Sequence, residues 1–511
     1  MAERGRLDPD VGYWAQRWDP EGRLHPLYYT SRYDHRWVNA TTLPVLYAAY
    51  PLWRLGGYRL TLLLPMLGSV AAAVAARALA RRLSGGTSDG WAAFWIVGLA
   101  SPLTIYALDL WEHSIGVALM AWAVVLLLDA AEERRRLSAF AGAGALFGAA
   151  AALRTEALVY AFVGVGAACL VLLVVRRKPV PAVAGGLVAV GAFAVPVVLN
   201  TVLEQVTVGQ AIRFGRAAGT ASAAVSDATG SGDGALATRL KEAFLTAGGL
   251  HPILEPMSCA VAVALVVLLA YACWRSTRPG GTGPAVVAGI GVVAMYGVRF
   301  ADGLGFVPGL AAATPLAVAG VVLGWRRFPG RFVLGVALAA LPLVWATQFS
   351  GGAGPQWAGR YILLSGLLAG VVGIVALPAL PLWVARGLVG LAATITVFGL
   401  AWTSQRTHQF AEALAALDRR PEPVVVSRVG HLGREGGWFY GDHRWLTAVY
   451  NEDATFAVDV LERAGVRSFA LVDLSESHRR DLAYPGWHVT GHSRVTLVRG
   501  VPLTVVTYET V

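Results

Sequence analysis

The chain is poor in charge and in cysteine. Charged residues make up 14% of its 511 residues, 56% are hydrophobic and the mean hydropathy is +0.56, whereas soluble domains carry about 25% charged residues. This composition excludes an ordinary soluble protein of this length. Cys169, Cys259 and Cys273 lie in or beside apolar runs without CxxC spacing. Neither a disulfide framework nor a thiolate metal site is indicated.

What the chain has instead is a series of long apolar runs. Several are shorter than the roughly 20 residues that a bilayer requires, yet together they predict about twelve membrane crossings. The runs lie at 58–80, 91–107, 114–128, 138–153, 157–175, 181–202, 258–271, 285–298, 306–324, 332–347, 361–380 and 387–403.

Cationic residues cluster after every second run. Short loops rich in Lys and Arg resist translocation, so these loops are expected to be cytoplasmic and the others external, in a multi-pass protein of the plasma membrane. The net charge of +10 is mostly accounted for by these loops, which argues against a nucleic-acid partner. The cytoplasmic clusters are Arg77, Arg81 and Arg82; Arg134 to Arg136; Arg176 to Lys178; Arg275 and Arg278; Arg326, Arg327 and Arg331; and Arg386.

These patterns predict an all-α polytopic membrane protein with a C-terminal external α/β domain. Residues 1–57 are expected to form a first external loop with an acidic motif, and 58–403 a transmembrane helical domain with a Gly- and Ser-rich external loop at 203–256. Residues 404–511 alternate like a soluble module. Its expected strands are 423–428, 468–474, 495–498 and 503–508, and its expected helices are 454–464 and 475–482.

The N-terminal segment conflicts with the charge pattern. It has no apolar run long enough for a signal peptide or an anchor. Yet the alternation of cytoplasmic and external loops along the chain places it outside. An external segment normally follows a signal or a span, so we expect a parent sequence with one further helix before this segment. The alternatives are a re-entrant segment and translocation of the N-terminal tail without such a helix.

Ionisable residues gather on the external rim, where they are costly unless they are paired or used. The first segment contributes Asp8 and Asp10. The next external loop contributes Asp109, Glu112 and His113, whose spacing of i, i+3 and i+4 places them on one face if they are helical. The alternatives are solvated loop charges in the first case and a helix cap with an internal ion pair in the second.

Two hairpin tips carry arginine. Arg154 and Glu156 join two apolar runs with almost no loop between them, so this arginine is expected to meet an anion, with Glu156 itself as the alternative. Gln356, Arg360 and Tyr361 form another tip. The planar fork of arginine suits phosphate because it donates two parallel hydrogen bonds and keeps its charge. Two such tips facing an acidic loop would suit a phosphate-bearing donor beside a general base.

Taken together, these features resemble the GT-C superfamily of polyprenyl-phosphate-sugar-dependent glycosyltransferases, and within it bacterial mannosyltransferase-like membrane proteins. The likeness covers nearly the whole chain in topology. It rests on the acidic first loop, the external C-terminal domain and three short motifs. These motifs are YALDLWEH at 106–113, RTE at 154–156 and QWAGRY at 356–361.

The resemblance implies inverting transfer of a sugar from a polyprenyl-phosphate donor to a cell-envelope glycan, lipid or protein acceptor on the external face. Asp10 would be the base, with Asp8 as its substitute. Arg154 and Arg360 would stabilise the leaving phosphate. The other candidate substrate-binding residues are Asp109, Glu112, His113, Glu156, Gln356 and Tyr361. Some members use a divalent metal and others do not, and no ligand spacing here decides between them.

Two other classes share part of this pattern. A secondary transporter also has about twelve spans, but it favours internal repeats and ionisable groups at mid-depth, whereas here the ionisable groups lie on one rim. A lipid-linked polymer ligase or polymerase would be expected to centre on one large external loop late in the chain.

Overall fold

The computed structural model divides into two compact units. A helical unit comprises Thr42–Glu204 and Ala211–Leu400, and a sheet unit comprises Met1–Thr41, Gln205–Gln210 and Ala401–Val511. The structure describes residues 10–27, 30–39, 42–132, 136–213, 243–251, 257–301, 303, 307–326, 328–347, 357–430, 432–435, 443–473, 484–498 and 501–511.

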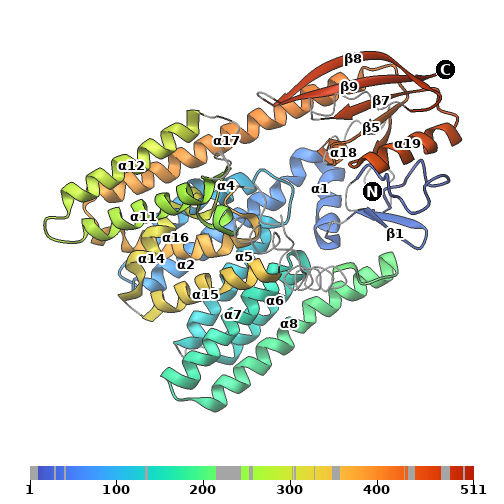
Figure 1. The fold of residues 1–511 in the computed structure, drawn as a ribbon. Coiled ribbons are helices and arrows are strands. Elements are labelled where there is room, and N and C mark those ends of the chain that lie inside the picture. The colour runs from blue at the N-terminus through green and yellow to red at the C-terminus, as the bar shows by residue number, and fades with distance from the viewer. Residues whose placement is uncertain are drawn as a thin grey trace, which may run out of the picture. The chain divides into compact units, whose positions relative to one another are not determined.

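The helical unit is built from long apolar helices (Figure 1). Within the described residues nine helices are long and apolar enough to cross a membrane, which confirms a multi-pass membrane protein. The helices are α1 (Leu43–Thr61), α2 (Leu63–Leu83), α3 (Trp91–Leu99), α4 (Pro102–Tyr106), α5 (His113–Ala131), α6 (Arg136–Leu153), α7 (Glu156–Leu170) with a π-turn (Val171–Val175), α8 (Pro179–Val208), α11 (Ser258–Ser276), α12 (Thr282–Ala301), α13 (Leu310–Ala313), α14 (Pro315–Leu323), α15 (Phe328–Thr347), η4 (Arg360–Ile362), α16 (Leu363–Ala376) and α17 (Leu382–Asp418).

Two of the predicted spans are not continuous helices. The run at 91–107 breaks into α3 and α4 at Ser101, and the run at 306–324 contains a short strand, α13 and α14. Pro102 and Pro315 each stand at the start of the new helix. Proline suits a first helical turn but cannot continue a helix, because it lacks the N–H that the preceding turn requires.

Small residues allow the helices of this unit to approach closely. A Cβ at Gly320 in α14 or at Gly373 in α16 would lie 2.0 Å from a backbone oxygen of the facing helix. Such positions let two backbones touch, which is how helices associate where lipid is the solvent. The most buried of the candidate spans are α5 and the helix that starts at Arg360 and contains α16. The candidate site lies at the beginnings of these two helices.

The opposite end of α5 is fixed by an ion pair. Arg82 of α2 donates to both oxygens of Asp129 in α5, over 2.6 and 2.7 Å. This end precedes Arg134 to Arg136, the loop that the charge pattern assigns to the cytoplasm. The two ends of α5 therefore carry different polar contacts.

The sheet unit contains a five-stranded sheet in the order β6-β5-β7-β9-β8. The strands β5, β6 and β7 are parallel, and β9 and β8 continue the sheet antiparallel. A helix, α19, connects β6 to β7. The bounds are β5 (Val424–Ser427), α18 (Leu432–Glu435), β6 (Arg444–Thr447), α19 (Asn451–Arg463), β7 (Ser468–Asp473), β8 (Trp487–Val498) and β9 (Val501–Thr510).

The N-terminal segment is part of this unit. It forms a hairpin of β1 (Thr30–Tyr33) and β2 (Arg36–Asn39), and its Leu24 and Trp37 are buried with α19 on one face of the sheet. The C-terminal part of α17 covers the other face. Trp14 Nε1 donates to the carbonyl of Trp445 over 2.9 Å. Residues 1–57, which the sequence treats as a separate loop, thus belong in their first part to the fold of the C-terminal module.

The strands expected from the sequence are present, but β6 was not predicted. Trp445 lies on β6, where it is 3% exposed and packs between the sheet and α17. The helix expected at 475–482 lies outside the described residues.

Candidate functional site

Arg154 is the centre of a buried polar cluster in the helical unit. It lies between α6 and α7 and is only 4% exposed. Its Nε donates to Oε1 of Glu156 over 2.7 Å, and its Nη1 lies 3.5 Å from Oε1 of Glu112. Nη1 also donates to Nδ1 of His113. The structure therefore unites the acidic loop and the first arginine tip.

The Arg154 guanidinium keeps its charge although it is buried. Burial alone lowers the pKa of Arg154, but the carboxylates of Glu156 and Glu112 outweigh this effect and raise the pKa above its ordinary value. Gly116 of α5 makes room for the side chain, since a Cβ there would lie 2.7 Å from Cγ of Arg154. Two carboxylates thus hold the Arg154 cation. The space it occupies is open only because position 116 is glycine.

The second arginine tip meets the first on one aromatic ring. Arg154 and Arg360 place their guanidinium carbons 4.9 Å and 4.7 Å from the ring centroid of Tyr361. Arg360 Nη2 also donates to the hydroxyl of Tyr361 over 3.0 Å, and Arg360 lies 5.5 Å from the ring of Trp111. Two cations from distant parts of the sequence therefore lie around one tyrosine.

A left-handed turn leads into Arg360. Ala358 and Gly359 have φ values of 59° and 63°. A Cβ at Gly359 would lie 2.4 Å from Cγ2 of Thr246, so both the backbone conformation and the available space require glycine at this position. This turn sets the direction of the backbone where it enters Arg360.

Several supporting residues were not predicted as site residues. The hydroxyl of Tyr106 donates to the carbonyl of Trp357 over 2.8 Å, and its ring lies edge-on to His113 at 5.0 Å. On α7, Tyr160 lies one turn after Glu156 and shares a 2.8 Å hydrogen bond with Ser365 of α16. The i, i+4 spacing from Glu156 was the available signal for Tyr160.

Two buried polar atoms of the cluster lack partners within the described part of the chain. These are Nη2 of Arg154 and Oε2 of Glu156. Buried polar groups are nearly always hydrogen-bonded, so such atoms require an explanation. Nη2 of Arg154 is a hydrogen-bond donor and Oε2 of Glu156 is an acceptor. Together they suit a ligand that has both acceptor oxygens and donor hydroxyls.

The remaining predicted site residues are Asp109, Asp10, Asp8 and Gln356. Asp109 precedes α5, and its carbonyl accepts from the amide of Trp111 over 2.7 Å. Asp10 belongs to the sheet unit, where its Oδ1 accepts from the amides of Gly12 (3.1 Å) and Trp37 (2.8 Å). Asp10 thus fixes the backbone of the N-terminal segment, whatever else it does. Asp8 and Gln356 are not among the described residues.

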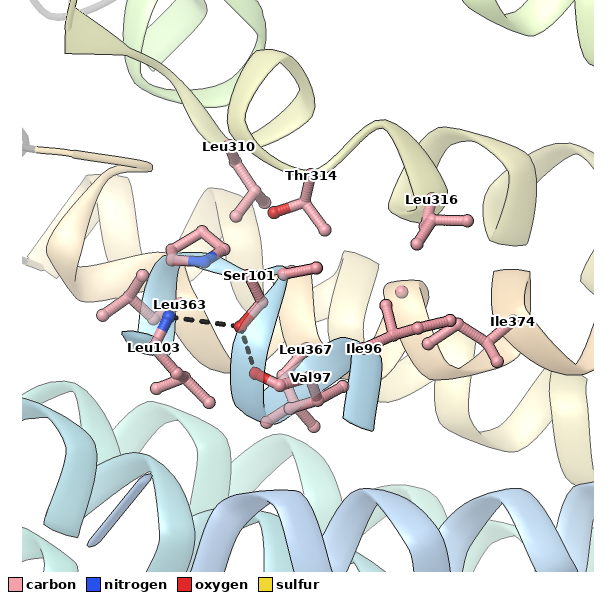
Figure 2. Close-up of a pocket in the computed structure, with 14 residues that line it drawn as sticks. Ile96, Val97, Ser101, Leu103, Leu310, Thr314, Leu316, Leu363, Leu367 and Ile374 are labelled. Atoms are coloured by element: carbon pink, nitrogen blue, oxygen red, sulfur yellow. Dashed lines mark hydrogen bonds between the residues drawn. The ribbon is translucent and has the colours of Figure 1, made fainter. Parts of the chain in front are cut away.

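A small cavity lies where the two helix breaks meet α16. Figure 2 shows Ser101 and Thr314 on its wall, with Oγ of Ser101 accepting from the amide of Leu103 and donating to the carbonyl of Val97. The cavity measures about 30 Å³, which holds one or two water molecules. It is too small for a sugar ring, so we do not place the site there.

The described residues include no group of three His, Cys, Asp or Glu side chains arranged to hold a metal ion. A divalent metal is implied only by the family resemblance.

No family model and no curated protein matches this chain. Solved structures similar to it include two of the Archaeoglobus fulgidus oligosaccharyltransferase, one tethered to an acceptor peptide and one in complex with zinc and sulfate. Their TM-scores are 0.44 and 0.40, with 13% and 14% identity over 91% and 87% of this chain. The chain spans 65% and 60% of those chains.

Another similar structure is ArnT from Cupriavidus metallidurans bound to undecaprenyl phosphate. Its TM-score is 0.36, with 13% identity over 98% of this chain and 94% of that chain. The similar structures thus include an oligosaccharyltransferase and a protein bound to undecaprenyl phosphate. None of them addresses the mannosyl specificity.

Proposed function

We propose that the protein is a membrane glycosyltransferase that moves a sugar from a polyprenyl-phosphate donor to a cell-envelope acceptor on the external face. The observation that carries this proposal is the pair of arginines, Arg154 and Arg360, around the ring of Tyr361. Two guanidinium groups at a membrane rim suit a phosphate that must be held at the end of a lipid tail.

Helix geometry supports an anion at the same place. The helices α5 and α7 begin at His113 and Glu156, and η4, which leads into α16, begins at Arg360. Contacts of Arg154 join all three of these helix starts. The amino end of a helix carries a partial positive charge, so three such ends attract a negatively charged group.

The acidic residues have a separate task in this scheme. Glu156 neutralises Arg154 through Nε only, which leaves Nη2 for the donor. Glu112 and Asp109 lie on the same rim, and carboxylates there accept hydrogen bonds from sugar hydroxyls. This division explains how an acidic loop and a phosphate site coexist.

The chemistry requires a base and a stabilised leaving group. A base, assigned to Asp10 by the family resemblance, takes the proton of the acceptor hydroxyl, whose oxygen attacks the anomeric carbon. The bond from that carbon to the phosphate oxygen breaks, and its electrons remain on the lipid phosphate. Arg154 and Arg360 stabilise the added charge, and the configuration at the anomeric carbon inverts.

The test is product analysis with membranes that contain the protein and a panel of radiolabelled polyprenyl-phosphate sugars. We expect one sugar to be transferred and the transfer to be lost in Arg360→Gln. Arg82→Gln is the matched control, because it breaks an ion pair at the other end of α5. Transfer that persists in Arg360→Gln, or a protein that uses no sugar of the panel, contradicts the proposal.

A further inference from the structure

The parallel part of the sheet has a topological switch point at β5. The chain goes from β5 to β6 on one side and then crosses through α19 to β7 on the other. In open α/β sheets ligands bind beside the carboxyl ends of the strands at such a point, because the connections there diverge. The carboxyl end of β5 is therefore the place in this unit to look for a ligand.

Polar side chains from three separate segments meet at this end. Arg428, which follows β5, donates from Nη2 to Oδ1 of Asn451 over 2.6 Å and lies 3.2 Å from Oδ2 of Asp473. Asn451 begins α19, and Asp473 ends β7. We call these three residues the β5 edge. They come from separate parts of the sequence, and their spacing gave no signal.

One atom of the β5 edge indicates a missing partner. The side chain of Arg428 is 7% exposed, yet its Nε has no hydrogen-bond partner among the residues that the structure describes. The side chain of Asp473 is 21% exposed, and Asn451 is exposed. A buried donor thus lies beside accessible acceptors, which is unusual for an ion pair with a purely structural role.

The charges at the edge favour a neutral ligand over an anion. Arg428 is already balanced by Asp473. Glu452 and Asp453 occupy the first turn of α19, and Arg23 pairs with Asp453. These carboxylates oppose the positive end of the helix dipole. Tyr450, immediately before α19, is 70% exposed and offers a flat apolar surface.

We propose that the β5 edge binds a carbohydrate. Neighbouring sugar hydroxyls both donate and accept, so they match the carboxylate of Asp473, the amide of Asn451 and the N–H groups of Arg428. The ring of Tyr450 supports the apolar face of the sugar. This site lies in the sheet unit, and it does not require the transfer reaction to be as proposed above.

The test is saturation-transfer NMR of the full-length protein in lipid nanodiscs with methyl glycosides of mannose, glucose, galactose and arabinose and the matching disaccharides. We expect at least one probe to bind. Tyr450→Ala and Asn451→Ala should each weaken it about tenfold, the effect of losing one modest contact. Both residues are exposed, so neither variant should compromise folding.

Two controls decide the location. Arg463→Gln removes an exposed ion pair at the other end of α19 and should leave binding unchanged. Arg154→Gln should also leave it unchanged, which separates this site from the one in the helical unit. Absence of binding by every probe, or binding of wild-type strength in both Tyr450→Ala and Asn451→Ala, overturns the proposal. Inorganic phosphate that binds instead, with loss in Arg428→Lys, assigns the edge to an anion and also overturns it.

Discussion

The ion pair of Arg154 and Glu156 allows stability to be separated from donor binding. Their side chains are 5% and 3% exposed. Arg154→Gln leaves the Glu156 carboxylate buried without its main cation, which costs about 3–5 kcal/mol of stability. Adding Glu156→Gln removes the stranded charge, so the double variant should recover most of that loss.

Donor binding should respond differently. If Arg154 donates to the lipid phosphate, its loss removes a charge-assisted hydrogen bond worth about 1.5–3 kcal/mol, or about 10- to 100-fold in donor affinity. The Glu156→Gln change cannot replace that bond. We therefore expect Arg154→Gln and the double variant to be equally weak in donor binding, although their melting temperatures differ.

The assay is a double-mutant comparison of donor affinity and melting temperature in detergent. The matched cycle is Arg82→Gln with Asp129→Asn, a pair that is more exposed, at 25% and 16%. That cycle should cost less stability, about 1–2 kcal/mol, and should leave donor affinity unchanged. Wild-type donor affinity in the double variant of Arg154 and Glu156 would refute the reasoning and reduce this ion pair to a structural role.

Three further outcomes are expected. Gly116→Ala should push Arg154 from its place, lower donor affinity and cost about 1–3 kcal/mol in a thermal melt, whereas Gly166→Ala, whose new Cβ would meet open space, should do none of these. Burial lowers the pKa of His25 from its ordinary 6.5. As the pH falls, the unfolded chain therefore binds the proton before the folded protein does. The stability that neutral His25 contributes is full above about pH 6.5 and falls below it. His25→Gln should flatten this fall when melting temperature is measured against pH. Asp10→Asn keeps an amide oxygen for its two backbone hydrogen bonds but cannot act as a base, so transfer should fall about 10²- to 10⁴-fold with an unchanged melting temperature; normal transfer would remove Asp10 from the mechanism.

Much of the fold could be predicted because hydropathy and charge act over whole segments. Each apolar run contains helix, and the alternating pattern after 404 marked four of the five strands of the main sheet. Single residues decided what was missed. Pro102 and Pro315 interrupt runs whose average hydropathy is high, and the short β6 carries too few residues to show an alternation.

The candidate site could be predicted in its parts but not in its assembly. A rim of ionisable residues follows from the cost of burying charge in lipid, so the arginine tips could be found from sequence. The contact of Arg154 and Arg360 with Tyr361 could not, because it depends on how α5, α7 and α16 pack. The role of Gly116 was equally hidden, since a glycine in an apolar helix gives no sign of what occupies the space beside it.

The geometry at Arg154 also explains why arginine suits this position better than lysine. A lysine ammonium would be attracted to Glu156 as a point charge. It has no planar group that could direct further N–H donors away from Glu156 in a fixed orientation. Arginine binds Glu156 through Nε and His113 through Nη1, and its planar group still directs Nη2 elsewhere. Arg154→Lys should therefore keep the ion pair and most of the stability but lose donor affinity. A lysine variant with full donor affinity would mean that charge alone, without the fork, is what the site uses.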